Sequence, residues 1–544
     1  MQIPGRLSIL LLVAVACRDS DTSSSGDLPQ VSAARLEEHI RYLASDRLAG
    51  RGTGTPGYDS AAGYVAEHYA RLGLDSAGTE GYFQPVPFRH ARAVEGSLVL
   101  AGRSGRRTLT PYKDYVPSPN FAALRAEVTA PLVFVGFGVT APEHGYDDYR
   151  GVDTKGKIIV LLTGAPASFP NTERAHFATR QTKRDNAVAH GAVGMLAVRT
   201  RDQSFPWDRL VRQSRRGEMR WLDGNGEPAD AWPTLRGVAT LSDSAAAQLF
   251  EGAPQSLAQV LDAAEAGKPT AFNLPARATL RTVNVHDRLE SPNVAGLLRG
   301  SDPELRDEVV VYTAHLDHLG IGEPVRGDSI YNGALDNASG SAALLEIARA
   351  FVTMPQAPRR SVMFLAVTGE EEGLLGSDYF AQQPTVPIER IVANVNIDGL
   401  NILYPFREVI PFGADHTTLD STVARVARGL GVTIGPDPFP QEVFFVRSDQ
   451  YSFVRRGVPA LFPFGGLRSD SGVDAVARFK EWLATRYHTP QDDSDQPMDL
   501  ETGGARNAQL EFLVGLEIAN ADERPAWKKG DFFGRTFGLA GQDR

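Results

Sequence analysis

The chain has 544 residues, of which 42% are hydrophobic, so it is too long for one ordinary domain and has enough apolar residues for a sizeable core. Its formal net charge is −10 and it contains no basic tract. Nucleic-acid binding draws most of its affinity from clustered lysine and arginine, so this composition argues against nucleic acid as a partner.

The N-terminus has the pattern of an export signal. Arg6 precedes an apolar run over 7–16, which is too short to span a bilayer, and Cys17 follows as the only cysteine of the chain. The run ends in Ala-Val-Ala-Cys, which resembles a bacterial lipobox, and an ordinary signal peptide with an incidental cysteine is the alternative. We predict a signal peptide with lipobox over 1–17 and a Ser/Asp-rich flexible tether over 18–30. The protein would then be exported to the bacterial cell envelope on a lipid anchor, or secreted.

The next segment combines two helical patterns with a glycine-rich loop. Residues 36–44 and 59–72 have helical apolar spacing, and between them lies RLAGRGTGTPG, residues 47–57, with three glycines in GxGxxG register. No strand precedes the loop, so we reject a dinucleotide site. We expect these glycines to form a tight surface turn.

From about Ala126 the pattern changes to short strands punctuated by glycine. Examples are PLVFVGFGV and KGKIIVLLTG, followed by a helix that contains 184–189, and the pattern continues to about Leu274. No cluster of possible metal ligands occurs in this segment. We predict a separate β-rich α+β unit over 126–275 with a structural or substrate-shaping role.

The following segment alternates apolar strands with helices. The run 309–313 and two later runs, RSVMFLAVTG and IVANVNIDG, read as buried strands, while 341–351 and 419–429 read as helices. This order predicts an α/β fold with a mixed, mostly parallel sheet and helices on both faces.

Each of the three strands ends in residues that can bind a metal. The candidates are His315, Glu370, Glu371 and Asp398 at strand ends, with Asp336 and His488 on loops. Parallel strands place their carboxyl ends along one sheet edge, where ligands bind in open α/β folds. Imidazole and carboxylate suit a divalent metal such as zinc, and two imidazoles with three of these carboxylates make five protein ligands, more than one open catalytic zinc needs. Two metals that share a carboxylate would use all five.

The spacing of His315 and Asp317 predicts a supporting contact. Side chains two residues apart at a strand end can point the same way. We therefore expect the Asp317 carboxylate to accept the second ring N–H of His315 and to orient it.

Five motifs give a specific resemblance. HLDHLG, NGALDNASG, GEEEGLLGS, VNIDGLN and YHTPQDD, in this order, resemble the co-catalytic di-zinc aminopeptidase family, which includes glutamate carboxypeptidase II and glutaminyl cyclase. The resemblance implies a zinc exopeptidase fold, formed by residues 31–125 and 276–521. The segment 126–275 resembles the protease-associated domain that many members carry, and the tail 522–544 has no assignment.

The resemblance also implies a role for each site residue and two Zn²⁺ ions as cofactors. His315 and Asp398 would bind one zinc, Glu371 and His488 the other, and Asp336 would bridge them. Glu370 matches the general base that acts with metal-activated water. Tyr487 matches a donor to the tetrahedral intermediate, or is packing alone. The chain departs from the family at Gln450, where Ser-Asp-His is common.

We therefore predict an exported aminopeptidase that cleaves N-terminal residues from peptides. A carboxypeptidase or dipeptidase on the same scaffold is the alternative, with Arg447 and Arg468 as possible donors to a substrate carboxylate. A non-catalytic, receptor-like member would have lost metal ligands, whereas this chain keeps all five and Glu370. The oligomeric state is left open.

Overall fold

The computed structural model describes residues 28–102, 105–201 and 206–539. The predicted signal peptide with Cys17 and most of the predicted tether lie outside these residues. Within them, no helix combines the length and the apolarity that crossing a membrane requires.

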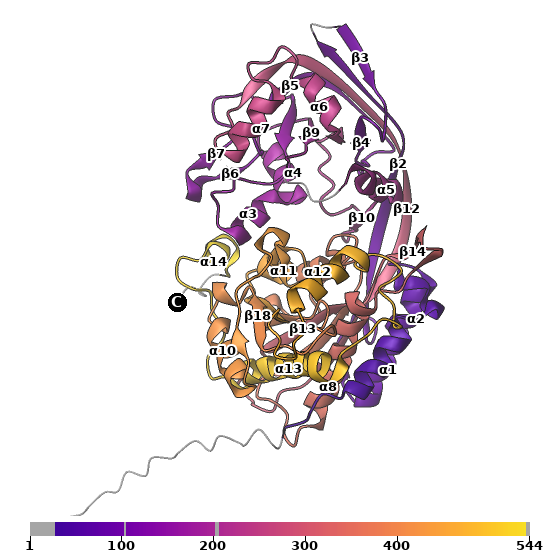
Figure 1. Cartoon of the computed structure of the whole chain (residues 1–544), viewed down its shortest axis with the longest axis vertical. Helices are drawn as coiled ribbons and strands as arrows, with labels where there is room; N and C mark the ends of the chain where they lie inside the picture. Colours follow the sequence, from indigo (N-terminus) through magenta and orange to yellow (C-terminus); the bar gives the residue numbers. More distant parts are fainter. Residues whose placement is uncertain (1–27, 103–104, 202–205, 540–544) are drawn as a thin grey trace, which may run out of the picture.

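The main unit is built on one large mixed sheet, most of it parallel (Figure 1). Its central strand, β13 (Val309–His315), pairs in parallel with β16 (Ser361–Val367) and β17 (Ile391–Asn396). Further strands extend it on one side: β20 (Ala460–Gly465), β18 (Glu408–Phe412) and β19 (Thr433–Ile434). The predicted α/β fold class is confirmed.

Helices cover both faces of this sheet. One face packs against α1 (Ala33–Leu43), α2 (Pro56–Leu72), α8 (Gly340–Thr353), α10 (Leu419–Gly429) and α13 (Ala505–Asn520). The other packs against α9 (Leu375–Gln382), α11 (Gln450–Val454) and α14 (Phe532–Phe537). Because β13 is buried on both faces, every one of its residues is buried and its sequence is a continuous apolar run up to the histidine.

Two long strands lead from the main unit into a second unit. β2 (Phe83–Gly102) and β12 (Phe272–Leu298) pair antiparallel along most of their length, and β12 also pairs with β16. The sheet then continues through β5 (Arg125–Phe134), β8 (Ile158–Leu162), β9 (Gly194–Val198), β11 (Val238–Leu241) and β4 (Tyr115–Pro117). The limits 126 and 275 of the predicted insertion fall inside β5 and β12, and its status as a separate domain stays a prediction.

The second unit, which contacts the main unit at two places, also carries helices (Figure 1). These helices are α3 (Asn171–Ala178), α4 (Arg180–Ala189), α5 (Trp207–Arg216), α6 (Asp243–Leu249) and α7 (Leu257–Glu265). Phe177 of α3 packs against Phe532 of α14, with ring centroids 5.6 Å apart. On the other side, Arg216 at the end of α5 donates to the carbonyl of Leu319 at 2.6 Å, in the loop that follows β13.

Candidate metal centre

The structure brings all five predicted ligands together at the carboxyl edge of the sheet. His315 is the last residue of β13, Glu371 follows β16, and Asp398 follows β17. Asp336 lies at the turn into α8, and His488 lies in the loop after α12 (Ala475–Thr485). Residues far apart in the sequence therefore meet because neighbouring parallel strands end at the same edge.

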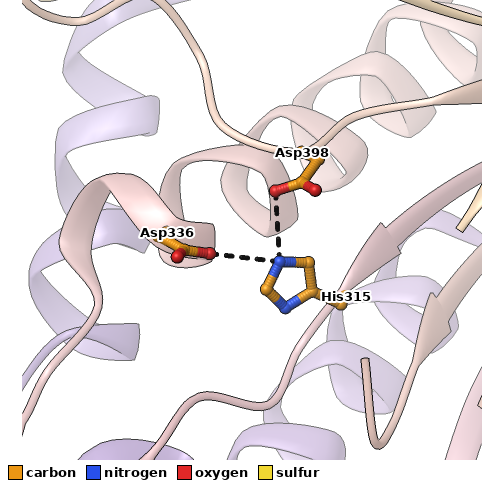
Figure 2. A group of neighbouring side chains, drawn as sticks. All are labelled: His315, Asp336 and Asp398. Atoms are coloured by element: carbon orange, nitrogen blue, oxygen red, sulfur yellow. Dashed lines mark hydrogen bonds and ion pairs between the residues drawn. The ribbon is translucent and has the colours of Figure 1, made fainter. Parts of the chain in front are cut away.

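Asp336 stands between two groups of ligands. Its Oδ1 is 3.2 Å from His315 Nε2, which is also 3.2 Å from Asp398 Oδ1. Figure 2 draws both contacts as dashed lines. Its Oδ2 is 3.1 Å from His488 Nε2, and that nitrogen is 3.3 Å from Glu371 Oε2. One carboxylate thus presents each of its oxygens to a different histidine–carboxylate pair, which is the arrangement a bridging ligand needs.

The hydrogen bonds of His315 test whether a cation fits. Its Nδ1 is 3.1 Å from the backbone carbonyl of Asp317, and a carbonyl only accepts, so Nδ1 carries the hydrogen. In the neutral ring, Nε2 then directs a lone pair at Asp336 and Asp398, which is repulsive unless a proton or a metal cation lies between them. Ligand atoms around a tetrahedral zinc with bonds of about 2.0 Å are about 3.3 Å apart, close to the separations here. The nitrogen and oxygen donors therefore fit a zinc-like ion.

The charge balance of the site also calls for cations. Burial alone would lower the pKa of the His315 imidazole, but the carboxylates of Glu370 and Asp398 outweigh it and raise that pKa well above its ordinary value. Burial also raises the pKa of the Asp449 carboxyl, to about 7. This cluster of buried acids is costly without positive charge beside it.

Asp317 supports the site in a different way from the one predicted. Its carboxylate is 3.9 Å from His315 Nδ1, whereas its backbone carbonyl receives the ring N–H, so the predicted side-chain contact is wrong. The carboxylate instead accepts the backbone N–H groups of Glu370 at 3.1 Å and Glu371 at 3.3 Å. Asp317 therefore positions the turn that carries the two glutamates.

The glycine-rich loop between α1 and α2 is a second correction, because it packs against the site rather than forming a surface turn. Arg51 is buried and donates to the carbonyls of Leu316 at 2.9 Å and Gly333 at 3.1 Å, which belong to the segments that carry His315 and Asp336. Thr53 donates to Asp317 Oδ2 at 3.1 Å.

The glycines of this loop allow that packing. A Cβ at Gly50 would lie 2.5 Å from the carbonyl oxygens of Gly320 and Tyr331, and the residue has a left-handed φ of 72°. Burial lowers the pKa of the Arg51 guanidinium to about 10, so at neutral pH it remains a cation beside the acids of the site.

Two further residues, Asp492 and His318, belong to the site. Asp492, in the motif that carries His488, accepts the backbone N–H of Leu335 and of Asp336, each at 3.0 Å. His318 lies in the first matched motif, HLDHLG. It is buried, and its Nδ1 lies 2.7 Å from Glu371 Oε1. The only sequence signal was their place inside the matched motifs.

Glu370 and Tyr487, the predicted base and donor, both line a cavity that opens at the metal ligands. Burial raises the pKa of the Tyr487 phenol well above its ordinary value, so the hydroxyl keeps its proton at neutral pH. The Tyr487 ring centroid is 3.9 Å from that of His488, which has a left-handed φ of 57°. Such a conformation costs a non-glycine residue about 1–3 kcal/mol and is typical of functional sites.

Gln450, the position at which the chain departs from the family motif, packs inside the protein. Its Oε1 accepts from Asn396 at 2.8 Å, its Nε2 donates to the carbonyl of Phe445 at 2.9 Å, and the side chain is fully buried. Of the two candidate carboxylate donors, Arg447 lines the cavity and pairs with Glu442 at 3.1 Å. Arg468 is exposed and does not line it.

The α/β sheet carries a two-sided ligand cluster at its carboxyl edge, and this cluster is a candidate centre for divalent metal ions. Residues 293–512 match the model described as peptidase family M28, so the chain is similar to that family over this segment.

Two relatives and one solved structure extend the comparison. Aminopeptidase NAALADL1 of Mus musculus is 25% identical over 440 residues, which is 70% of this chain and 56% of the relative. Probable glutamate carboxypeptidase VP8 of Zea mays is 25% identical over 437 residues, 73% of this chain and 54% of the relative. The chain thus spans about half the length of these relatives. An aminopeptidase structure from Aneurinibacillus sp. strain AM-1 shares the fold, with a TM-score of 0.52, 19% identity and coverage of 91% of this chain and 95% of that chain.

Proposed function

We propose that this protein is a zinc aminopeptidase that holds two Zn²⁺ ions and removes N-terminal residues from peptides. The observation that carries the proposal is Asp336, whose two oxygens each face a separate histidine–carboxylate pair, with Glu370 on the same cavity. The aminopeptidases among its relatives support the choice of reaction.

The proposed ligands are divided between the ions by these contacts. His315 and Asp398 would hold one ion, Glu371 and His488 the other, and Asp336 both. When bound, zinc would polarise the scissile carbonyl and lower the pKa of water towards ~7.

Glu370 is the proposed general base. Its carboxylate would take a proton from the attacking water and pass it to the leaving amine, while Asp317 fixes its backbone through the N–H at 3.1 Å. Tyr487, a phenol that keeps its proton, would donate a hydrogen bond to the oxyanion of the tetrahedral intermediate.

Recognition of the free amine favours the aminopeptidase over the carboxypeptidase alternative. Carboxylates dominate the polar end of the cavity and would bind a substrate ammonium group. Arg447, which lines this cavity, is already paired with Glu442. The relative from Zea mays is named a probable glutamate carboxypeptidase. Carboxypeptidase activity is therefore the alternative that the experiment must exclude.

A peptide library tests the reaction. The zinc-loaded protein is incubated with mixed peptides, free and N-acetylated, and the products are read by mass spectrometry. We expect loss of the first residue from free peptides and none from the acetylated set. Trimming from the C-terminus of both sets would overturn the aminopeptidase proposal and favour the carboxypeptidase.

The cellular location is a separate proposal, which rests on the sequence of residues 1–17 alone. We propose export and lipid attachment at Cys17, with the following polar segment as a tether between membrane and enzyme.

A further inference from the structure

Besides the cavity at the metal ligands, a second cavity of about 20 Å³ lies in the second unit. It is lined by helix α4, by the chain after β4 and by the segment that leads into β11. None of the five predicted metal ligands lines it. One water molecule needs roughly 10–15 Å³ on this measure, so the cavity has room for a single small ligand.

Arg184 of α4 brings a positive charge to the wall of this cavity. Only 5% of the residue is exposed, and its Cζ lies 5.0 Å from the centroid of the Trp232 ring, which also lines the cavity. Its Nη2 donates to Ser118 Oγ at 3.4 Å, which is longer than an ordinary hydrogen bond of this kind. Its Nε is buried and has no hydrogen-bond partner among the residues that the structure describes. Because a buried donor without an acceptor is costly, a ligand that supplies the acceptor would be stabilised here.

The protein does not balance the charges around Arg184. Burial lowers the pKa of its guanidinium to about 10, although the carboxylates of Glu218 and, more weakly, Asp230 act in the opposite direction. Burial alone would raise the pKa of the Glu218 carboxyl, but three arginines outweigh burial and lower that pKa. These arginines are Arg184, Arg220 and Arg180. One carboxylate thus serves three guanidinium groups, and its Oε2 accepts from Arg220 Nη2 at 3.1 Å.

The other polar side chains of the wall can donate hydrogen bonds. Ser118 Oγ accepts from the guanidinium, so its own O–H is directed elsewhere. Asn120 Oδ1 accepts two backbone N–H groups at 2.9 Å, which leaves the amide N–H groups as donors. Arg236 is a second cation of the wall, and no aspartate or glutamate of the described ranges lines it. Positive charge with N–H and O–H donors and without carboxylates suits an anion.

We propose that this cavity binds one small monovalent anion, such as chloride, which accepts hydrogen bonds from Arg184 and Ser118 and neutralises the buried guanidinium. The volume suits a monatomic ion, whereas sulfate and phosphate, with four oxygens around a central atom, are too large. The anion binds the folded protein only, because the segments of the wall meet only when the second unit is folded. The inference is separate from the proposed peptidase reaction, and its failure would leave that proposal intact.

The dependence of stability on halide tests the site. Differential scanning calorimetry compares the zinc-loaded protein in sodium chloride, sodium bromide and sodium methanesulfonate at equal ionic strength. Because a ligand of the folded state raises the unfolding temperature, we expect the two halides to raise it by on the order of 1–2 °C over methanesulfonate, whose anion is too large for the cavity. Equal unfolding temperatures in all three salts would overturn the inference.

A pair of variants on α4 assigns the effect to the cavity, since halides also bind zinc ions. Arg184→Gln removes the buried charge and should abolish the rise in halide. Arg180→Gln removes the same charge one helical turn earlier, at an exposed position that does not line the cavity, and should retain the rise. Each variant is compared with itself in the different salts, so a general loss of stability does not affect the result. An unchanged rise in Arg184→Gln, or an equal loss in both variants, would contradict the assignment.

Chloride NMR measures binding to the folded protein directly. The parent should broaden the chloride line more than Arg184→Gln does. Ser118→Ala keeps the charge and removes one proposed donor, so we expect its chloride affinity to fall about tenfold, as for the loss of a hydrogen bond to a charged group. Equal chloride affinity in Ser118→Ala and the parent would refute the site, even if Arg184→Gln did not fold.

Discussion

The carboxylate of Asp492 accepts the backbone N–H of Asp336 at 3.0 Å, and this bond fixes the residue that stands between the two proposed zinc ions. Groups that orient a metal ligand typically contribute 10–100-fold to metal affinity or activity. We therefore expect Asp492→Ala to weaken zinc binding by about that factor, as measured by competition with a chelator. Asp495→Asn, an exposed neighbour without a contact to Asp336, is the matched control. Equal zinc affinity in Asp492→Ala and the parent would refute this role.

Asp336 should be essential for both ions. We expect the parent to bind two equivalents of zinc after reconstitution and dialysis, and Asp336→Ala to bind less than one, because each oxygen faces a different ligand pair. Metal analysis by plasma emission measures both values. A parent that holds one equivalent at most would rule out the two-ion site.

Glu370 should affect the reaction far more than the metal content. Glu370→Gln keeps the size of the side chain and removes the base, so we expect turnover to fall by ~10²–10⁴-fold. Metal analysis of the same sample should still give the zinc content of the parent. Near-normal hydrolysis by this variant would refute the assignment.

Local patterns allowed us to predict the fold class and the meeting of candidate ligands at one sheet edge, whereas the role of each ligand came from the resemblance. Apolar runs that stop at His315, Glu371 and Asp398 place these residues at strand ends, and parallel pairing brings such ends together. The prediction for Asp317 failed because β13 ends at His315, so the strand alternation on which it relied no longer holds beyond that residue.

The contacts of the glycine-rich loop were beyond sequence reasoning for a different reason. Arg51 donates to the carbonyl of Leu316, 265 positions away in the chain. The glycines indicate that the chain can turn and approach another backbone closely, but not which segment lies opposite. Long-range burial of a single arginine leaves no periodic signal.

Cys17 should determine where the protein is found in a bacterial host. If this cysteine is lipidated, Cys17→Ser removes the attachment point, and we expect the protein to move from the membrane fraction to the soluble one. Immunoblots of both fractions measure the distribution, with Ser23→Ala in the same polar segment as control. Unchanged membrane association of the cysteine variant would exclude the lipid anchor.

The buried carboxyl of Glu511 should make the free energy of unfolding fall as the pH rises. The residue lies on α13, fully buried, and its Oε1 accepts from Asn507 at 2.9 Å, while Oε2 has no partner among the residues that the structure describes. Burial raises the pKa of this carboxyl well above its ordinary value. Above about pH 4.3, the unfolded chain has released the proton that the folded protein still holds, so the free energy of unfolding falls with increasing pH until the folded pKa is passed.

Glu511→Gln removes the titrating group and keeps an acceptor for Asn507. We expect this variant to unfold at a higher temperature than the parent at pH 8, by on the order of 2 °C, with a smaller difference at pH 5. Differential scanning calorimetry measures the difference in unfolding temperature between the variant and the parent at each pH. Glu517→Gln, at a half-buried position on the same helix, is the control. Its difference in unfolding temperature from the parent should not increase between pH 5 and pH 8. A gap for Glu511→Gln that stays constant or shrinks from pH 5 to pH 8 would show that the carboxyl is ionised in the folded protein.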